Sequence, residues 1–301
     1  MELTILGSGQ PLPEVDRGGA AITADLGGDR VLVDCGPKAV HRLLEQGVDI
    51  TAIEDVFFTH HHVDHNASFL YFAVISWYVG RTDLTVYGPR GTESLVDGIE
   101  SIYDQTVESW TQWSNLVGET TPKAGIDDVE TVHVDPDFEH DADGWSVSAL
   151  AVSHDTEIFD PRAYRFEEHE TGRSFVFSGD TAAIPEMADF AAGADVLVHE
   201  ANALGPDETL LPKTEIPDQY LEPPFEKYYE SYFDDDSAEG VERHHTAAPE
   251  AADLAADAGV DALVLSHLNC YRDVAQVREQ AEARFDGEVL VAEDGLTLSR
   301  A

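Results

Sequence analysis

Basic residues are scarce in this chain of 301 residues. It has 17 lysines and arginines against 60 aspartates and glutamates, so the formal net charge is −43 at pH 7 and the pI is near 4.2. Surfaces that bind nucleic acid usually gather lysine and arginine on one face, so this composition argues against a broad basic groove. It does not exclude an anionic substrate, because a metal ion can outweigh the field of more distant acidic groups.

Cysteines and long apolar runs are also scarce. Cys35 and Cys270 lie within apolar runs and provide no disulfide framework, which favours a reducing compartment. The N-terminus has no basic segment followed by a long apolar one, so we expect no signal peptide. The apolar run at 69–79 is too short to cross a bilayer. The expected location is therefore the cytoplasm.

The acidic residues are spread along the whole chain. An acidic disordered tail would instead concentrate the charge in blocks and dilute the aromatic residues. Such a surface repels itself in dilute buffer, whereas at molar salt the Debye length falls to about 3 Å and the repulsion is screened. The charge therefore resembles that of proteins from extreme halophiles.

Short β-rich runs alternate with helical segments. We predict strands at 3–6, 21–26, 30–35, 55–59, 84–87, 130–133, 146–154, 163–166, 174–178, 196–199 and 262–265. We predict helices at 38–46, 66–79, 92–108, 184–191, 248–257 and 274–284, and an irregular stretch around Trp110 and Trp113. This mixed order favours an α/β fold, a four-layer αββα sandwich of two mixed sheets, over a single parallel sheet. We expect one domain over residues 1–301.

The segment 204–243 interrupts this pattern. It contains five prolines, the acidic run Asp234–Asp236 and six aromatic residues, more than a solvated loop needs. One interpretation is an ordered surface insertion or a dimer contact. The other is a lid over an active site.

Four potential metal ligands lie within six residues: His60, His62, Asp64 and His65. His60 and His62 are two residues apart on an extended segment, so their side chains point to the same side. Neutral imidazoles and a carboxylate are the ligands expected for zinc or manganese. A solvated histidine-rich turn is the alternative, but the apolar strand before the cluster and the aromatic helix after it argue against that.

Three more potential ligands each follow an apolar strand: His154, Asp180 and His267. A single histidine in such a place is more often an ordinary polar residue than a ligand. Three such strand ends, in a chain that already carries the histidine motif, reverse this expectation. Together they would supply the ligands that the motif lacks.

These motifs resemble the metallo-β-lactamase superfamily, specifically its tRNase Z-like branch. The resemblance rests on Thr-His-His-His-Val-Asp-His at 59–65, His154, Ser-Gly-Asp-Thr at 178–181, His-Glu-Ala-Asn at 199–202, His-His-Thr at 244–246 and Ser-His at 266–267. It implies a hydrolase with two divalent metal ions, zinc or manganese, and a homodimer.

The resemblance also implies a role for each ligand. One ion would be bound by His60, His62 and His154 and the other by Asp64, His65 and His267, with Asp180 bridging the two. A water or hydroxide between the ions would be the nucleophile. Asp34 resembles the family's buried acid that orients the histidine loop.

The branch carries a glutamate–histidine pair that protonates the leaving group, and the resemblance assigns this role to Glu200 and His244. His244 fits the family's His-x-Thr pattern better than His245 does. The alternative is that His244 is only a residue at the entry to a helix. We count Asp64 with this pair among the catalytic residues. His199 is expected to lie next to the metal ligands as a supporting group.

The tRNA-processing members carry a long arm, rich in glycine and basic residues, between the third-motif histidine and the bridging aspartate. Here the interval 155–179 has 25 residues and several acids. Lack of the arm argues against pre-tRNA processing. We therefore expect a dinuclear phosphodiester hydrolase, with RNA among its substrates and cleavage that is exonuclease-like or directed at 3′ ends. The alternatives are an arylsulfatase-like or other small-ester hydrolase and an inactive nucleic-acid-binding paralogue.

Overall fold

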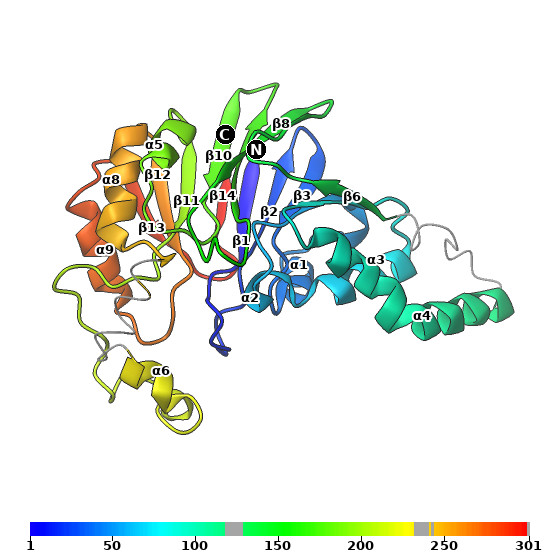
Figure 1. Cartoon of the computed structure of the whole chain (residues 1–301), viewed down its shortest axis with the longest axis horizontal. Helices are drawn as coiled ribbons and strands as arrows, with labels where there is room; N and C mark the ends of the chain where they lie inside the picture. The colour runs from blue at the N-terminus through cyan, green and yellow to red at the C-terminus, as the bar shows by residue number, and fades with distance from the viewer. Residues whose placement is uncertain (118–128, 232–240, 242–243, 300–301) are drawn as a thin grey trace.

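Two β-sheets pack face to face at the centre of the molecule, with helices on both outer faces (Figure 1). The computed structural model describes residues 1–117, 129–231, 241 and 244–299. Within these residues the first sheet has seven strands in the order β14-β1-β2-β3-β4-β5-β6. The second also has seven, in the order β13-β12-β11-β10-β9-β8-β7. The expected αββα sandwich of two mixed sheets is confirmed.

The first sheet combines an antiparallel meander with parallel strands. Its strands are β1 (Glu2–Gly7), β2 (Ala21–Leu26), β3 (Asp29–Val33), β4 (Ile53–Phe57), β5 (Thr85–Gly88), β6 (Glu130–His133) and β14 (Thr297–Ser299). The strands from β3 to β6 run parallel, so their carboxyl ends meet at one edge. Its outer face is covered by the helices α1 (Ala39–Glu45), α3 (Phe69–Val79) and α4 (Thr92–Val117), with η1 (Ile50–Ala52) beside them.

The second sheet is parallel in the half that follows β9. Its strands are β7 (Glu139–Asp141), β8 (Trp145–Ala151), β9 (Arg162–Glu168), β10 (Arg173–Phe177), β11 (Val196–Glu200), β12 (Ala262–Ser266) and β13 (Glu288–Val291). Helices α5 (Glu186–Phe190), α8 (Ala248–Ala258) and α9 (Val274–Glu282) cover its outer face. Every residue of β11 and β12 is buried, as expected for parallel strands covered on both faces.

Aromatic side chains fill the space between the sheets. Phe57 from the first sheet meets Trp145, Tyr164 and Phe166 from the second, with ring centroids 5.1 to 6.0 Å apart. Alternate residues of β8 point into this layer, which matches a strand with one buried face. This packing fixes the position of one sheet relative to the other. It therefore also fixes the polar residues at the strand ends of the two sheets relative to one another.

Several local predictions need correction. The stretch with Trp110 and Trp113 is helical, because α4 continues to Val117 and Trp110 packs on Tyr78 with ring centroids 4.4 Å apart. The helix predicted at 66–79 begins at Phe69 as α3, and a separate short helix, α2 (Val63–Asn66), precedes it. Strands β7, β13 and β14 were not predicted, since β7 and β14 are three residues long and lack an alternating apolar pattern.

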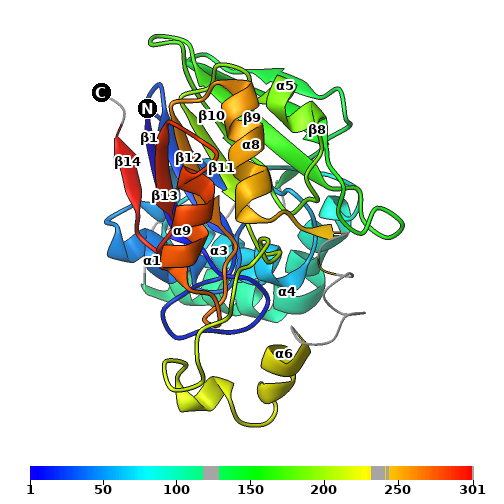
Figure 2. The same cartoon turned by 90° about the vertical axis from the view of Figure 1, so that its left-hand side faces the viewer.

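The segment 204–243 leaves the second sheet after β11 and returns before α8. Its described part carries η2 (Asp218–Tyr220) and α6 (Glu226–Ser231), which lie below the sandwich in Figure 2. Residues 232–240, including the acidic run, and residues 242–243 lie outside the described part of the chain. Among the described helices, none is both long and apolar enough to cross a membrane.

Candidate metal centre

The potential ligands from both sheets meet at one edge of the sandwich. His60 and His62 follow β4, and Asp64 and His65 lie on α2 directly after them. His154, Asp180 and His267 follow β8, β10 and β12. The structure therefore brings all seven side chains proposed from the sequence into two adjoining groups.

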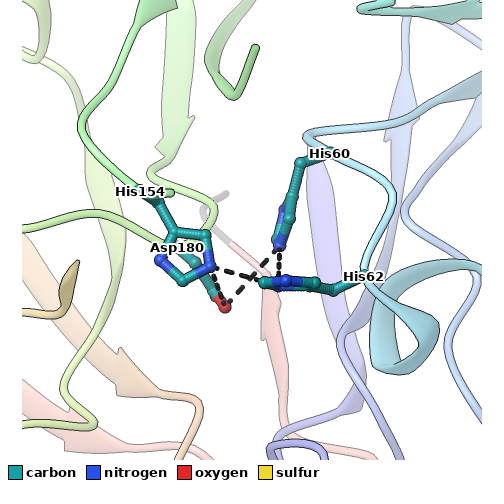
Figure 3. A group of neighbouring side chains, drawn as sticks. All are labelled: His60, His62, His154 and Asp180. Atoms are coloured by element: carbon teal, nitrogen blue, oxygen red, sulfur yellow. Dashed lines mark hydrogen bonds and ion pairs between the residues drawn. The ribbon is translucent and has the colours of Figure 1, made fainter. Parts of the chain in front are cut away.

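The first group is His60, His62, His154 and Asp180 (Figure 3). The Nδ1 atom of His62 lies 3.0 Å from Nε2 of His60 and 3.1 Å from Nε2 of His154. One carboxylate oxygen of Asp180, Oδ2, lies 3.9 Å from each of those two Nε2 atoms. His60, His154 and Asp180 are buried, while the His62 side chain is 30% exposed and faces the pocket.

The second group is Asp64, His65, Asp180 and His267, all of them buried. Nε2 of His267 lies 3.1 Å from Oδ2 of Asp64 and 3.3 Å from Oδ2 of Asp180. The other Asp180 oxygen, Oδ1, lies 3.3 Å from Nε2 of His65. Asp180 therefore belongs to both groups, which is the position expected of a bridging carboxylate.

Unpaired polar atoms indicate that these groups fit metal ions. Within the described chain, Oδ1 of Asp64 and Nε2 of His65 are buried without a hydrogen-bond partner. Buried polar atoms are normally paired, so such a cluster needs an explanation. In each group the candidate ligand atoms lie within 4.8 Å of one another, and imidazole nitrogens with carboxylate oxygens are a donor set for zinc or manganese. The residues present therefore fit the two ions that the family resemblance implies.

Hydrogen bonds outside the two groups orient the ligand rings. Oδ2 of Asp34 lies 2.7 Å from Nδ1 of His65, and Oδ1 of Asp34 accepts the N–H of Thr59 at 2.9 Å. On the other side, Nδ1 of His154 lies 2.9 Å from the carbonyl oxygen of His244. Both rings therefore present Nε2 to the centre, and Asp34 occupies the orienting position expected for it.

Burial affects the charge of two histidines of the first group, His60 and His154. It lowers the pKa of His154 and holds the pKa of His60 well below its usual range, although Asp180 opposes both shifts. Since a metal ligand must be a neutral imidazole, both side chains are in the form that binds an ion.

The histidine beside Glu200 is His245, and this corrects the expected pairing with His244. Nδ1 of His245 lies 2.8 Å from Oε1 of Glu200, whose two oxygens also accept the N–H groups of Thr181 and Asn202. His244 lies at the rim, with its Nδ1 atom 3.3 Å from Oδ1 of Asp155. Two adjacent histidines both fit near the motif, so spacing alone could not distinguish them.

The Glu200–His245 pair lies next to the second group, with Glu200 buried and the His245 side chain 13% exposed. Burial alone would lower the pKa of His245, but the Glu200 carboxylate reverses the shift and raises that pKa to about 9. The ring of His245 stacks on that of His267, with centroids 5.6 Å apart. His199 is fully buried and its Nδ1 atom contacts the Glu200 carbonyl oxygen at 2.8 Å, so it lies beside this pair and outside both ligand groups.

A pocket of about 470 Å³ opens onto this centre. The pocket is lined by candidate metal ligands, by the histidine that pairs with Glu200 and by residues of two other segments. These lining residues are Gln10, Pro11, His62, His154, Asp155, Asp180, Asn202, Ser231, Val241, His244, His245 and His267. The sequence did not single out Gln10, Pro11 or Asn202 as site residues. Gln10 and Pro11 follow β1 at the same sheet edge as the ligands, and this position after a predicted strand is the signal that could have identified them.

A sequence profile of the beta-lactamase superfamily domain matches residues 29–268. The chain belongs to the metallo-β-lactamase superfamily. Ribonuclease Z from Methanopyrus kandleri is 30% identical to it over 303 residues, which cover 98% of this chain and 96% of that protein. This likeness places it in the tRNase Z-like branch of the superfamily.

Solved metallo-β-lactamase structures share the fold. The metallo-beta-lactamase fold protein YhfI from Bacillus subtilis is 19% identical, with a TM-score of 0.69 and 99% coverage of both chains. Human tRNase Z, short form, is 21% identical, with a TM-score of 0.64 and 99% coverage of both chains. At these identities the two structures support the architecture of the sandwich.

Proposed function

We propose that the chain is a metal-dependent ribonuclease that hydrolyses phosphodiester bonds. The observation that carries this proposal is the position of Asp180, which contacts both ligand groups next to the Glu200–His245 pair. The likeness to ribonuclease Z over nearly the whole chain supports RNA as a substrate. Within this activity we propose exonuclease-like cleavage or cleavage at 3′ ends.

The two ligand groups would hold two divalent ions, with zinc as our proposal for the metal. Ions bound there would lower the pKa of a water between them and stabilise negative charge on the phosphate oxygens. Asp180 would hold both sites at a constant separation, while Asp34 and the His244 carbonyl keep two ligand rings in place. The three imidazoles of the first group support zinc over magnesium, because magnesium prefers oxygen ligands.

We propose that His245 is the residue that gives a proton to the leaving oxygen. Its side chain lines the pocket, and its Nδ1 atom is held by Glu200, so Nε2 is the atom available for transfer. This replaces the role expected for His244. Asp64, which was counted as catalytic from the resemblance, is proposed to act as a ligand of the second ion.

The interval expected to hold the tRNA-gripping arm is occupied by the loop 155–161, β9 and β10. This arrangement supports our proposal that the chain lacks the arm. A small-ester hydrolase is therefore the second candidate function. A pocket of about 470 Å³ suits a compact ester as well as one end of an RNA strand.

Hydrolysis rates at molar salt test the proposal. Bis-p-nitrophenyl phosphate, end-labelled RNA and p-nitrophenyl sulfate should be compared with zinc or manganese added. We expect turnover of both phosphodiesters, loss of it in His62→Ala, and retention in the control His133→Ala, whose side chain is exposed and pairs with Asp135. Faster cleavage of the sulfate ester would select the arylsulfatase-like alternative. Full metal occupancy without turnover would select the inactive paralogue.

Three further proposals concern the state of the protein. The dispersed acidic charge supports a halophilic origin, and two unpaired cysteines support a cytoplasmic location.

Exposed apolar side chains on α3 and α4, namely Val79, Ile102 and Trp113, support a homodimer. Light scattering at high salt that gave only a monomer would contradict the dimer.

A further inference from the structure

A buried arginine lies behind the glutamate of the Glu200–His245 pair. Arg272, on the segment between β12 and α9, is 2% exposed. Its guanidinium donates hydrogen bonds from Nη1 to the carbonyl oxygens of Ala201 and Asn202, each at 2.9 Å. These two residues directly follow Glu200 at the end of β11, so Arg272 holds the backbone that leads away from the pair.

One of these carbonyls connects Arg272 to the Glu200 carboxylate. The N–H of Asn202 donates to Oε2 of Glu200 at 2.8 Å, while Oε1 lies 2.8 Å from Nδ1 of His245. The Ala201 carbonyl and the Asn202 N–H belong to the same planar peptide unit, so a contact that fixes one also orients the other. Hydrogen bonds therefore connect Arg272 through this peptide and Glu200 to His245.

Glu208 balances the charge of Arg272. Its two carboxylate oxygens accept hydrogen bonds from Nε and Nη2 of Arg272, the second at 2.8 Å, and both side chains are fully buried. Oε2 of Glu208 also accepts the N–H of Gly205 at 2.9 Å. A planar guanidinium can present two parallel donors to one carboxylate, which a lysine ammonium cannot do. The pair therefore keeps the guanidinium in one orientation, with Nη1 directed at the two carbonyls.

We infer that Arg272 is a positioning residue for hydrolysis, which keeps the Glu200 carboxylate where it holds His245. This inference rests on the proposed function, in which His245 protonates the leaving oxygen. A buried ion pair adds little net stability, because desolvation of both charges offsets their attraction, so stability alone does not account for it. Within the described chain, Arg272 belongs neither to the pocket lining nor to the ligand groups, so it acts through Glu200.

The proton transfer is the step that this position would affect. Hydrolysis forms a P–O bond to the oxygen of water and breaks the P–O bond to the leaving group, whose oxygen takes the proton of His245. The proton that the water releases passes to solvent, from which His245 is protonated again. If Glu200 is displaced, the His245 ring loses its fixed orientation and the proton reaches the leaving oxygen less often.

The test compares a leaving group that needs a proton with one that does not. A dinucleotide releases a ribose oxygen that must be protonated, whereas bis-p-nitrophenyl phosphate releases a stable phenolate. The double variant Arg272→Gln, Glu208→Gln removes both buried charges together, so neither is left unpaired. We expect its kcat for the dinucleotide to fall about 10- to 100-fold. Its kcat for the nitrophenyl ester should change less than about threefold, with unchanged metal content.

Two single variants accompany this comparison. Arg272→Lys keeps the positive charge but lacks the planar fork, so it should recover only part of the dinucleotide kcat. It also carries the same comparison if the double variant does not fold. The matched control Arg284→Lys changes an exposed arginine that pairs with Asp253, and it should behave like the wild type with both substrates.

The outcomes separate this role from the proposed function. Equal losses with both diesters, loss of metal, or an unchanged dinucleotide kcat would overturn the positioning role. If the wild type hydrolyses neither diester, the proposed function fails, and proton–nitrogen correlation spectra of the histidine rings with zinc added then test the contact. The Nδ1 signal of His245, assigned from its loss in His245→Asn, should shift in Arg272→Lys and not in Arg284→Lys. An unshifted signal in Arg272→Lys would overturn the role.

Discussion

The two halves of the sandwich supply their ligands in different ways. The first half contributes His60, His62, Asp64 and His65 from one short segment after β4. The second contributes His154, Asp180 and His267 from three separate strand ends. In the first half the spacing is local, so the backbone conformation of a few residues sets the ligand geometry. In the second half the spacing depends on strand order, register and the aromatic layer between the sheets.

The largest expected effect comes from the second half. Asp180→Asn removes the one charge that both ligand groups share, so we expect loss of bound metal from both and a fall in kcat of about 10³-fold or more. By contrast, His62→Ala changes the first group alone and should leave one ion bound. Elemental analysis of the purified variants measures this difference.

The matched control for this comparison is Asp253→Asn, an exposed carboxylate paired with Arg284. Two ions retained in Asp180→Asn would contradict the bridging position.

The next effect distinguishes the two adjacent histidines. His245→Ala should lower kcat by about 10²- to 10⁴-fold with both ions retained, because the residue beside Glu200 is lost. His244→Ala should stay within about tenfold of the wild type, since the contact that orients His154 comes from its backbone carbonyl and survives the change. Steady-state kinetics with metal content measured in parallel checks this order, and the reverse order would restore the assignment expected from the motif.

A smaller effect is expected for the orienting acid of the first half. Asp34→Asn removes the charge that faces Nδ1 of His65, so metal affinity should fall by about 10- to 100-fold. Saturating metal should restore most of the activity, because the ligands themselves are unchanged. Chelator competition at fixed pH measures the affinity, and an unchanged dissociation constant would show that ring orientation does not depend on Asp34.

The last effect is on stability rather than on activity and concerns a contact between the halves. Burial raises the pKa of Glu14 to about 7, although its hydrogen bond from the N–H of Cys270 opposes the shift. The folded state then binds the Glu14 proton more tightly than the unfolded state does. The contribution of the protonated carboxyl group to stability is therefore complete below pH 4.5 and is lost as the pH rises to about 7.

Glu14→Gln keeps the acceptor and removes the charge. The free energy of unfolding of this variant should therefore exceed that of the wild type by at most about 3 kcal/mol at pH 8, and by much less at pH 4.5. Chemical unfolding at both pH values in the same molar salt measures the difference. A gain that is equal at the two values would mean that Glu14 does not titrate on folding.

Much of the fold could be predicted from local pattern. The strand at Ala21–Leu26 and the strand at Glu130–His133 have the predicted bounds, and the helices that cover each sheet begin near the predicted residues. Predictions failed where local pattern is weak. β14 has one buried residue, Leu298, and exists because β1 offers it an edge to pair with.

By itself, the sequence determined the αββα architecture, the dense ligand segment after β4 and the strand ends that complete it, because apolar periodicity and ligand spacing are local properties. Only the tertiary structure decided three other matters. It placed His245 rather than His244 beside Glu200, brought Gln10 and Pro11 to the pocket, and held the loop 8–18 against the segment 204–243 through Tyr220. Each of these depends on contacts between residues far apart in the chain, which packing of the two sheets and burial of apolar side chains select.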